Sequence, residues 1–479
     1  MNGRQKARIL IPHLVLAALT AWSTRVHAFD VLRAEQGISA TAAASIVPVC
    51  AFDKTPGRPL GLQEAVERTL CSNPKTREAW AAVKAQAAGV GVARAAYLPQ
   101  ISANWQGERE SSVTDIENHP QLSSDSNATV RSAGVSANWT LYDFGGREAT
   151  LRNAKALLEA ARATQDATLQ DSFATVAKDY YATQAAMSEL QAANDVEAMT
   201  HRSMTAAQAR TDRGVAPITD ALQAQTQHEQ AVFSLTKAQS DAQTALGMLA
   251  ADMNLDPSVP LEVPPVTEGA VTGKTFSEPV AQMIRDVEDT HPSVRAARAQ
   301  YEAALAKVAQ TRAQGLPTIS LVGKYDRNNQ PQSLGLGLPT FPATGHEAYI
   351  GVQVNIPLFE GFGRHYQIDQ AKAQAERQAD AIDEAAQKVA LDVWTSYQTL
   401  TGATKNAENS ANLVAIAQRS YDAARHRYDV GVGNILELMN TQAALANAKQ
   451  RRIQALADWD NARVDLASKL GTLGREDIP

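Results

Sequence analysis

The stretch "RYDVGVGNILELMN", residues 427–440, decides the fold, because the chain carries a second version of it 217 positions earlier, "RTDRGVAPITDALQ", residues 210–223. Both versions place Arg, Asp, Gly-Val and Ile at the same positions, and Glu437 corresponds to Asp220. A Gly-Val that interrupts helix-forming sequence and is followed by a carboxylate is typical of a turn between two helices. The repetition therefore predicts a duplicated helical hairpin with this stretch at its tip.

Other short motifs recur in the same order. Three of them have an offset of 217 or 218 residues, namely Asn73-Pro74 with His291-Pro292, "YLPQI" (97–101) with "GLPTI" (315–319), and "LYDFGGR" (141–147) with "LFEGFGR" (358–364). Leu246-Gly247 and Leu470-Gly471 are 224 residues apart. The extra seven residues equal one heptad and predict a second copy that is two helical turns longer.

Each copy is expected to follow the same plan. A first helix of about 36 residues runs from Leu62 to Tyr97, since Pro99 disfavours helix at the preceding residue. After the strands, Arg147 to Arg213 contain neither Gly nor Pro, which predicts a helix roughly 100 Å long at 1.5 Å per residue. A second helix of about 34 residues starts near Pro217. Helices of this length are typical of coiled coils.

Between these helices the sequence predicts strands. Residues 131–142 alternate apolar and polar side chains with a period of two, and the other expected strands are 101–112, 318–326 and 348–359. Such strands with long polar loops are typical of outer-membrane barrels, although a soluble hairpin sheet is the alternative. Four strands cannot close a barrel, eight fill their own interior, and twelve from three chains leave an opening.

The N-terminus has the features of a secretory signal peptide: basic Arg4, Lys6 and Arg8, an apolar run from Ile9 to Leu19, and a cleavage-like sequence ending at Ala28. A soluble or disordered start is the alternative. Cleavage would change the formal net charge from −6 to −10, which argues against a nucleic-acid partner. In an exported chain the two cysteines, Cys50 and Cys71, favour one disulfide over two buried thiols.

Taken together, the motifs at 73–74, 97–101, 141–147 and 210–220 resemble the TolC-like outer-membrane efflux proteins, from Leu62 to Leu473. The resemblance implies a mainly α protein with a small β part: duplicated long hairpins and four strands per chain. It implies a homotrimer with a twelve-strand barrel in outer-membrane lipid and a helical tunnel that crosses the bacterial periplasm. A periplasmic adaptor and an inner-membrane ABC transporter or other pump would dock at the tip.

On this basis the chain divides into six parts: signal peptide 1–28, N-terminal periplasmic extension 29–61, first repeat 62–253, equatorial linker 254–278, second repeat 279–473 and C-terminal tail 474–479.

The resemblance also implies a gate. Tyr428 corresponds to a tip tyrosine that holds the closed state, and Glu437 to a carboxylate that forms a ring in the pore. Asn440 stands at a second acidic position and Gly433 at a basic one, so we expect one acidic ring and fewer latching pairs. A ring of Glu would favour cations. The alternative for Glu437 and Asp220 is that each only stabilises a helix N-terminus.

Four tip residues, Gly214, Val215, Gly431 and Val432, are candidates for adaptor contact, and the glycines are also suited simply to forming turns. The sequence predicts no catalytic, cofactor or metal site: "GAVTGKT" (269–275) is one residue too short for a phosphate loop, and the His and Cys residues lack metal-ligand spacing.

We therefore expect a passive exit duct. Type I secretion of a protein is favoured, because the chain resembles outer-membrane components that export RTX toxins such as the adenylate cyclase–haemolysin, and no lipid-anchor Cys follows the signal. Multidrug efflux is the alternative. A periplasmic coiled-coil adaptor is more remote, because it would normally have one hairpin flanked by β-rich domains.

Overall fold

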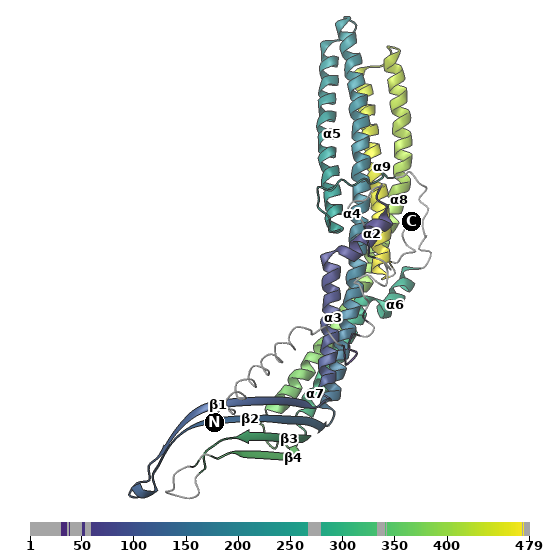
Figure 1. Ribbon diagram of the computed structural model, residues 1–479. Coiled ribbons are helices and arrows are strands. Elements are labelled where there is room, and N and C mark those ends of the chain that lie inside the picture. Colours follow the sequence, from purple (N-terminus) through teal and green to yellow (C-terminus); the bar gives the residue numbers. More distant parts are fainter. Residues whose placement is uncertain are drawn as a thin grey trace, which may run out of the picture. The chain divides into compact units, whose positions relative to one another are not determined.

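The computed structural model describes residues 30–35, 38, 50–52, 59–266, 279–332, 341, 343–471 and 473 (Figure 1). The expected signal peptide, most of the N-terminal extension, the second half of the linker (267–278) and the C-terminal tail lie outside these residues. The chain forms two compact units, each built from both repeats. The sheet unit comprises Met1–Ile38, Lys84–Ala154 and Ala309–Arg364, and the helical unit Ser39–Val83, Lys155–Val308 and His365–Pro479.

The sheet unit contains one antiparallel sheet in the order β1-β2-β3-β4. Its strands are β1 (Gln100–Thr114), β2 (Ser124–Tyr142), β3 (Thr318–Asn328) and β4 (Gly345–Asn355). All four expected strands are present, but β1 and β2 extend further toward their connecting turn than the sequence indicated. Apolar side chains on the sheet, including Ile101, Trp105 and Ile350, are exposed in the single chain.

The expected first helix is two helices in both repeats, which corrects the prediction of one continuous segment. α2 (Leu62–Ser72) is followed by α3 (Pro74–Ala95), and α6 (Val280–Thr290) by α7 (Pro292–Ala313). The residues between them, Asn73 and His291, have extended backbones with ψ of 132° and 134°. The cause is the proline that follows each of them, because its ring disfavours helical geometry at the preceding residue.

The long helices match between the repeats in length. α4 (Gly146–Asp212) and α8 (Gly363–Asp429) have 67 residues each, and α5 (Ile218–Asp252) and α9 (Ile435–Lys469) have 35 each. The expected extra heptad in the second copy is therefore wrong. The true equivalents are Asn254 and Gly471, which follow α5 and α9 with φ of +56° and +66°. Asn and Gly both tolerate this left-handed conformation, so the turn is kept although the residue differs.

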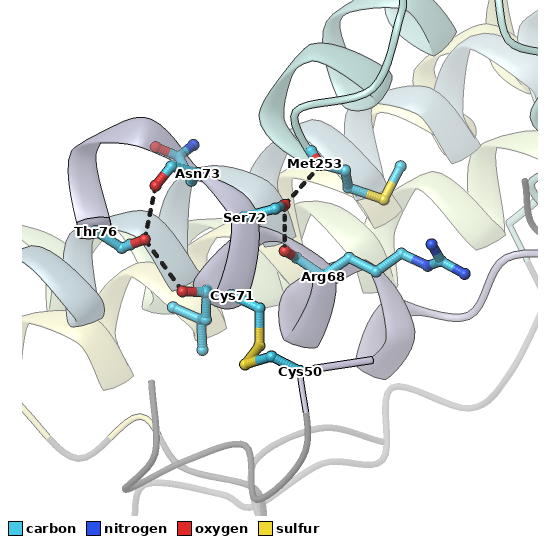
Figure 2. Close-up of a disulfide and its surroundings, with 8 residues drawn as sticks. Cys50, Arg68, Cys71, Ser72, Asn73, Thr76 and Met253 are labelled. Atoms are coloured by element: carbon cyan, nitrogen blue, oxygen red, sulfur yellow. Dashed lines mark hydrogen bonds between the residues drawn. A yellow bond between two sulfur atoms is a disulfide. The ribbon is translucent and has the colours of Figure 1, made fainter. Parts of the chain in front are cut away.

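The core of the helical unit lies where α2, α4 and the end of α5 meet, and it contains Leu70, Phe173, Val176 and Leu249. A disulfide between Cys50 and Cys71, with an S–S distance of 2.00 Å, joins the segment before α2 to this core (Figure 2). Next to it, the Ser72 hydroxyl donates to the carbonyl oxygen of Met253 at 2.7 Å. The N-terminal extension, α2 and the end of α5 are thus linked by covalent and polar contacts.

Candidate functional site

The two hairpin tips have the same backbone conformation. At the first tip, Val215 N–H donates to the carbonyl of Arg210 at 3.0 Å, and Gly214 has φ of +73°. At the second, Val432 N–H donates to the carbonyl of Arg427 at 3.0 Å, and Gly431 has φ of +84°. This is the Schellman arrangement that ends helices at a left-handed glycine. Both glycines thus have a turn-forming role.

The helices that follow the two tips begin differently. Asn434 is the N-cap of α9, and its side-chain oxygen accepts a hydrogen bond from Glu437 N–H at 2.7 Å. Pro217 occupies the equivalent place before α5 and provides no side-chain cap. Both predicted carboxylates, Asp220 and Glu437, lie in the first turns of their helices. A carboxylate in the first turn is stabilised by the helix dipole, so both positions are compatible with that simpler role.

Tyr428 is the centre of a contact between the repeats. Its side chain is only 5% exposed and packs with Tyr421, Ile435 and Leu438. The Arg210 guanidinium of α4 lies 4.1 Å from the centre of the Tyr428 ring and donates to the Tyr428 carbonyl oxygen at 2.6 Å. Burial raises the pKa of the Tyr428 hydroxyl, and the positive charge of Arg210 opposes this shift. Arg210 therefore joins the tip of the first hairpin to the tip of the second.

Glu437 has a different partner. Its carboxylate lies 3.6 Å from Arg427 Nε, and both side chains are partly exposed, so the pair is a weak surface ion pair. Asn440 is exposed. Arg427 occupies the sequence position that corresponds to Arg210, so the two equivalent arginines have different partners.

Gly433, where the resemblance leads one to expect a basic residue, is held close to the preceding turn. A Cβ at this position would lie 2.9 Å from Tyr428 N and 3.0 Å from Arg427 C. Contacts below 3.0 Å require the backbone to shift, so this turn favours glycine.

The predicted contact residues lie on the outside of the tips. Val215 is 73% exposed and Val432 is 71% exposed. Each follows its left-handed glycine directly, so the turn places an apolar side chain in solvent at both tips. Both valines are thus accessible to a contacting protein.

A buried polar contact holds α4 against α9 further from the tips. The Gln442 amide donates to the Ser203 hydroxyl at 2.6 Å, and both residues are buried. Lys449 of α9 and Asp195 of α4 are 3.9 Å apart on the same side. In Figure 1, α4 and α9 are the inner pair of the four long helices, with α5 and α8 on the outside.

Sequence reasoning missed Arg210, Asn434 and the Ser203–Gln442 pair. The first two lie inside the repeated tip motif, so a residue-by-residue comparison of the two tips was the available signal.

Among the described residues no three His, Cys, Asp or Glu side chains are grouped to bind a metal, and no helix there is both long and apolar enough to span a membrane.

Comparison with known proteins identifies the family. The family model described as outer membrane efflux protein matches residues 65–254 and 283–472. Protein CyaE of Bordetella pertussis is 31% identical over 88% of this chain and 85% of its own length. Outer membrane efflux protein BepC of Brucella suis is 26% identical over 87% of this chain and 86% of its own length.

The fold comparison agrees. The crystal structure of the outer membrane protein VceC from Vibrio cholerae superimposes with a TM-score of 0.71 at 18% identity, covering 86% of this chain and 96% of that one. The chain thus belongs to the outer membrane efflux protein family, and it is an outer-membrane channel with a large helical part in the periplasm.

Proposed function

We propose that the protein is the exit duct of a tripartite exporter and acts as a homotrimer with no catalysis of its own. Three chains together supply twelve strands, enough for a barrel with an open interior, whereas the four strands of one chain cannot close. The observation that carries the proposal is the four-stranded sheet, whose apolar side chains, Ile101 and Trp105 among them, are exposed in the part of the chain that the structure describes. These side chains are suited to lipid.

The tips are the docking site for the periplasmic adaptor, which in turn links the duct to an inner-membrane pump. Support comes from the equivalent exposure of Val215 and Val432 on two identical turns. A trimer would present six such turns in two alternating kinds, so an adaptor would meet a repeated apolar surface. The closed state is held inside each chain by the Arg210–Tyr428 contact, and Glu437 supplies a ring of carboxylates at the constriction.

The cargo is a protein exported by type I secretion. This assignment rests on the resemblance to type I secretion components, and on the higher identity to CyaE (31%) than to BepC (26%), whose name refers to efflux. Small-molecule efflux is the second candidate, favoured by that same name. Deleting the gene separates the two: loss of a protein from the culture medium supports secretion, whereas increased sensitivity to antibiotics or detergents with an unchanged medium supports efflux.

The assembly itself is tested by native mass spectrometry on protein extracted from outer membranes in detergent. A mass of three mature chains is expected. A monomer recovered from the periplasm would contradict the barrel and, with it, the proposed transport mechanism.

A further inference from the structure

Two histidine side chains face each other across the first hairpin. The rings of His201 on α4 and His228 on α5 have their centres 5.2 Å apart, with an angle of 70° between their planes. The two helices run side by side from the first tip (Figure 1), and the pair lies about 20 Å along α4 from Gly214. The histidines are 27 residues apart in the sequence, so only the fold brings them together.

The second hairpin has no imidazole at either place. With the repeat offset of 217 residues, His201 corresponds to Gln418 and His228 to Leu445. Leu445 is 3% exposed and belongs to the apolar cluster at the second tip. His228 therefore occupies a packing position, and its side chain is only 12% exposed. A polar ring at such a position is costly unless its nitrogens have partners.

One nitrogen of the buried ring lacks such a partner. His228 Nδ1 is buried and has no hydrogen bond to any described residue. Glu197 Oε1 lies 3.9 Å from it, just beyond hydrogen-bond distance. Glu197 and His201 are one turn apart on the same face of α4. A small rotation of the Glu197 side chain, which is 30% exposed, would bring its carboxylate onto Nδ1–H and leave Nε2 with its lone pair.

This arrangement is typical of histidines that bind metals. A histidine that ligates a metal donates its other ring N–H to a carboxylate or a carbonyl, which fixes the tautomer. With Zn–N of about 2.05 Å and tetrahedral angles, two imidazoles on one zinc ion have their centres about 5 Å apart. The two rings already have this separation. Imidazole suits Zn²⁺, Cu²⁺ and Ni²⁺, whereas Mg²⁺ and Ca²⁺ prefer oxygen ligands.

We propose that His201 and His228 bind a divalent ion that prefers imidazole ligands, such as Zn²⁺, and that Glu197 positions the His228 ring. Water completes the coordination. Two imidazoles are fewer than the three-ligand group that the described residues lack, and they hold zinc more weakly than the four ligands of a structural site. The zinc is therefore exchangeable. It joins α4 to α5 within one chain, so the inference does not depend on the proposed trimer.

The test measures zinc binding to the full-length protein in detergent, purified without a histidine tag and stripped of metal by a chelator. Equilibrium dialysis should find Zn²⁺ bound to the unaltered chain, and an equal concentration of Mg²⁺ should not displace it. His201→Gln replaces an exposed side chain and should lower the zinc affinity at least about ten-fold, as should His228→Gln. Thermal midpoints without metal check that each variant is folded, and His201→Gln alone decides if His228→Gln is unstable.

The matched control is His365→Gln. His365 is exposed on α8 with Asp369 at 3.2 Å from its Nε2, but its ring contacts Tyr366 instead of a second imidazole. This variant should bind zinc as the unaltered chain does. Zinc affinity unchanged in His201→Gln would overturn the proposal and leave the two rings as a stacking contact only. Displacement of the zinc by Mg²⁺ would also overturn it, because the ion would then be held by surface carboxylates.

A second variant pair tests the positioning role of Glu197. Glu197→Gln should lower the zinc affinity roughly ten-fold, because a neutral amide orients the His228 ring less well, without lowering the thermal midpoint measured in the absence of metal. Glu229→Gln removes an exposed carboxylate directly after His228 and should leave the affinity unchanged. Equal losses of affinity in the two variants would mean that Glu197 acts only through its charge.

Discussion

The two tips of the molecule share a backbone but differ in what their side chains contact. Both end a 67-residue helix with the same turn, at Gly214 and Gly431. Ile435, however, is 2% exposed, whereas the equivalent Ile218 is 66% exposed. The difference shows that a duplicated sequence can preserve a turn through its local hydrogen bonds, while burial depends on which neighbour each copy meets.

The largest loss of stability is expected at Tyr428, whose ring and carbonyl contact Arg210 of the first tip. Tyr428→Ala removes a buried aromatic side chain from the tip cluster and takes away the ring beneath Arg210, which should cost about 3 kcal/mol. Hydrogen exchange measured on peptides from 205–215 and 422–440 would report the opening free energy of both tips. The equivalent change, Thr211→Ala, should cost about 1 kcal/mol or less. Equal effects would mean that the contact between the tips is not asymmetric.

The C-terminal ends of α5 and α9, away from the tips, differ in their ionisable side chains. Asp252 at the end of α5 lies beside Asp179, and burial and the contact with Asp179 raise its pKa to about 7, against the opposing charge of Lys75. The equivalent residues in the second repeat are Lys469 and Ser396. Asp252 Oδ2 is buried and has no other hydrogen-bond partner. A proton shared between the two carboxyl groups would supply that hydrogen bond.

Since the folded protein holds this proton up to about pH 7 and the unfolded chain releases it near pH 4, the folded state binds more protons between these values. Stability should therefore fall as pH rises through this window. The thermal midpoint should be higher at pH 5 than at pH 8, and Asp252→Asn should reduce the difference. Some of it should remain, because burial also raises the pKa of Asp460 to about 6.

Asp256→Asn is the control for this prediction. Hydrogen bonds from Ser258 lower the pKa of Asp256, so its removal should not diminish the stabilisation at pH 5. A pH dependence that is unchanged in Asp252→Asn would assign it to groups outside the Asp179–Asp252 pair.

The helix starts offer a smaller contrast. Asn434→Ala removes the side chain that accepts from Glu437 N–H and should destabilise the first turn of α9 by about 1 kcal/mol. Pro217→Ala removes no side-chain cap from α5 and should have little effect there. Hydrogen exchange at the first turns of α5 and α9 would measure both. A larger increase in exchange from Pro217→Ala than from Asn434→Ala would contradict this prediction.

The smallest effect concerns ion selectivity. Glu437→Gln keeps the size of the side chain and removes its charge, so the ratio of potassium to chloride permeability in planar bilayers should fall if the carboxylate faces the pore. Asp220→Asn should change this ratio less. An unchanged ratio in Glu437→Gln would restrict Glu437 to its ion pair with Arg427 and the helix start.

The sequence predicted what is local and repeated. The tip turns, the four strands and the long helices follow from Gly, Pro and periodicity within a few residues of each element. The break between α2 and α3 is also encoded, by Pro74, although the helical pattern on both sides of it favours one continuous segment. The supposed extra heptad came from aligning two identical dipeptides, whereas the structural equivalents at 254 and 471 are different residues. The Arg210–Tyr428 contact spans 218 residues and depends on packing that no local pattern reports.

The unequal lengths of the strands have a consequence for the cell surface. β2 pairs with β3 from Ser132 onward, and Asn329, directly after β3, adds hydrogen bonds to Arg131 and to the carbonyl of Thr129. Residues 124–128 pair with β1. At about 3.3 Å per residue, this β1–β2 ribbon extends about 26 Å beyond Asn328, the last residue of β3 that pairs with β2. It does so at the end of the sheet opposite to the strand ends that lead into α3 and α4. In an outer-membrane trimer, three such ribbons would stand above the rim. Residues 115–123, which join β1 to β2, would then be open to a protease added outside whole cells.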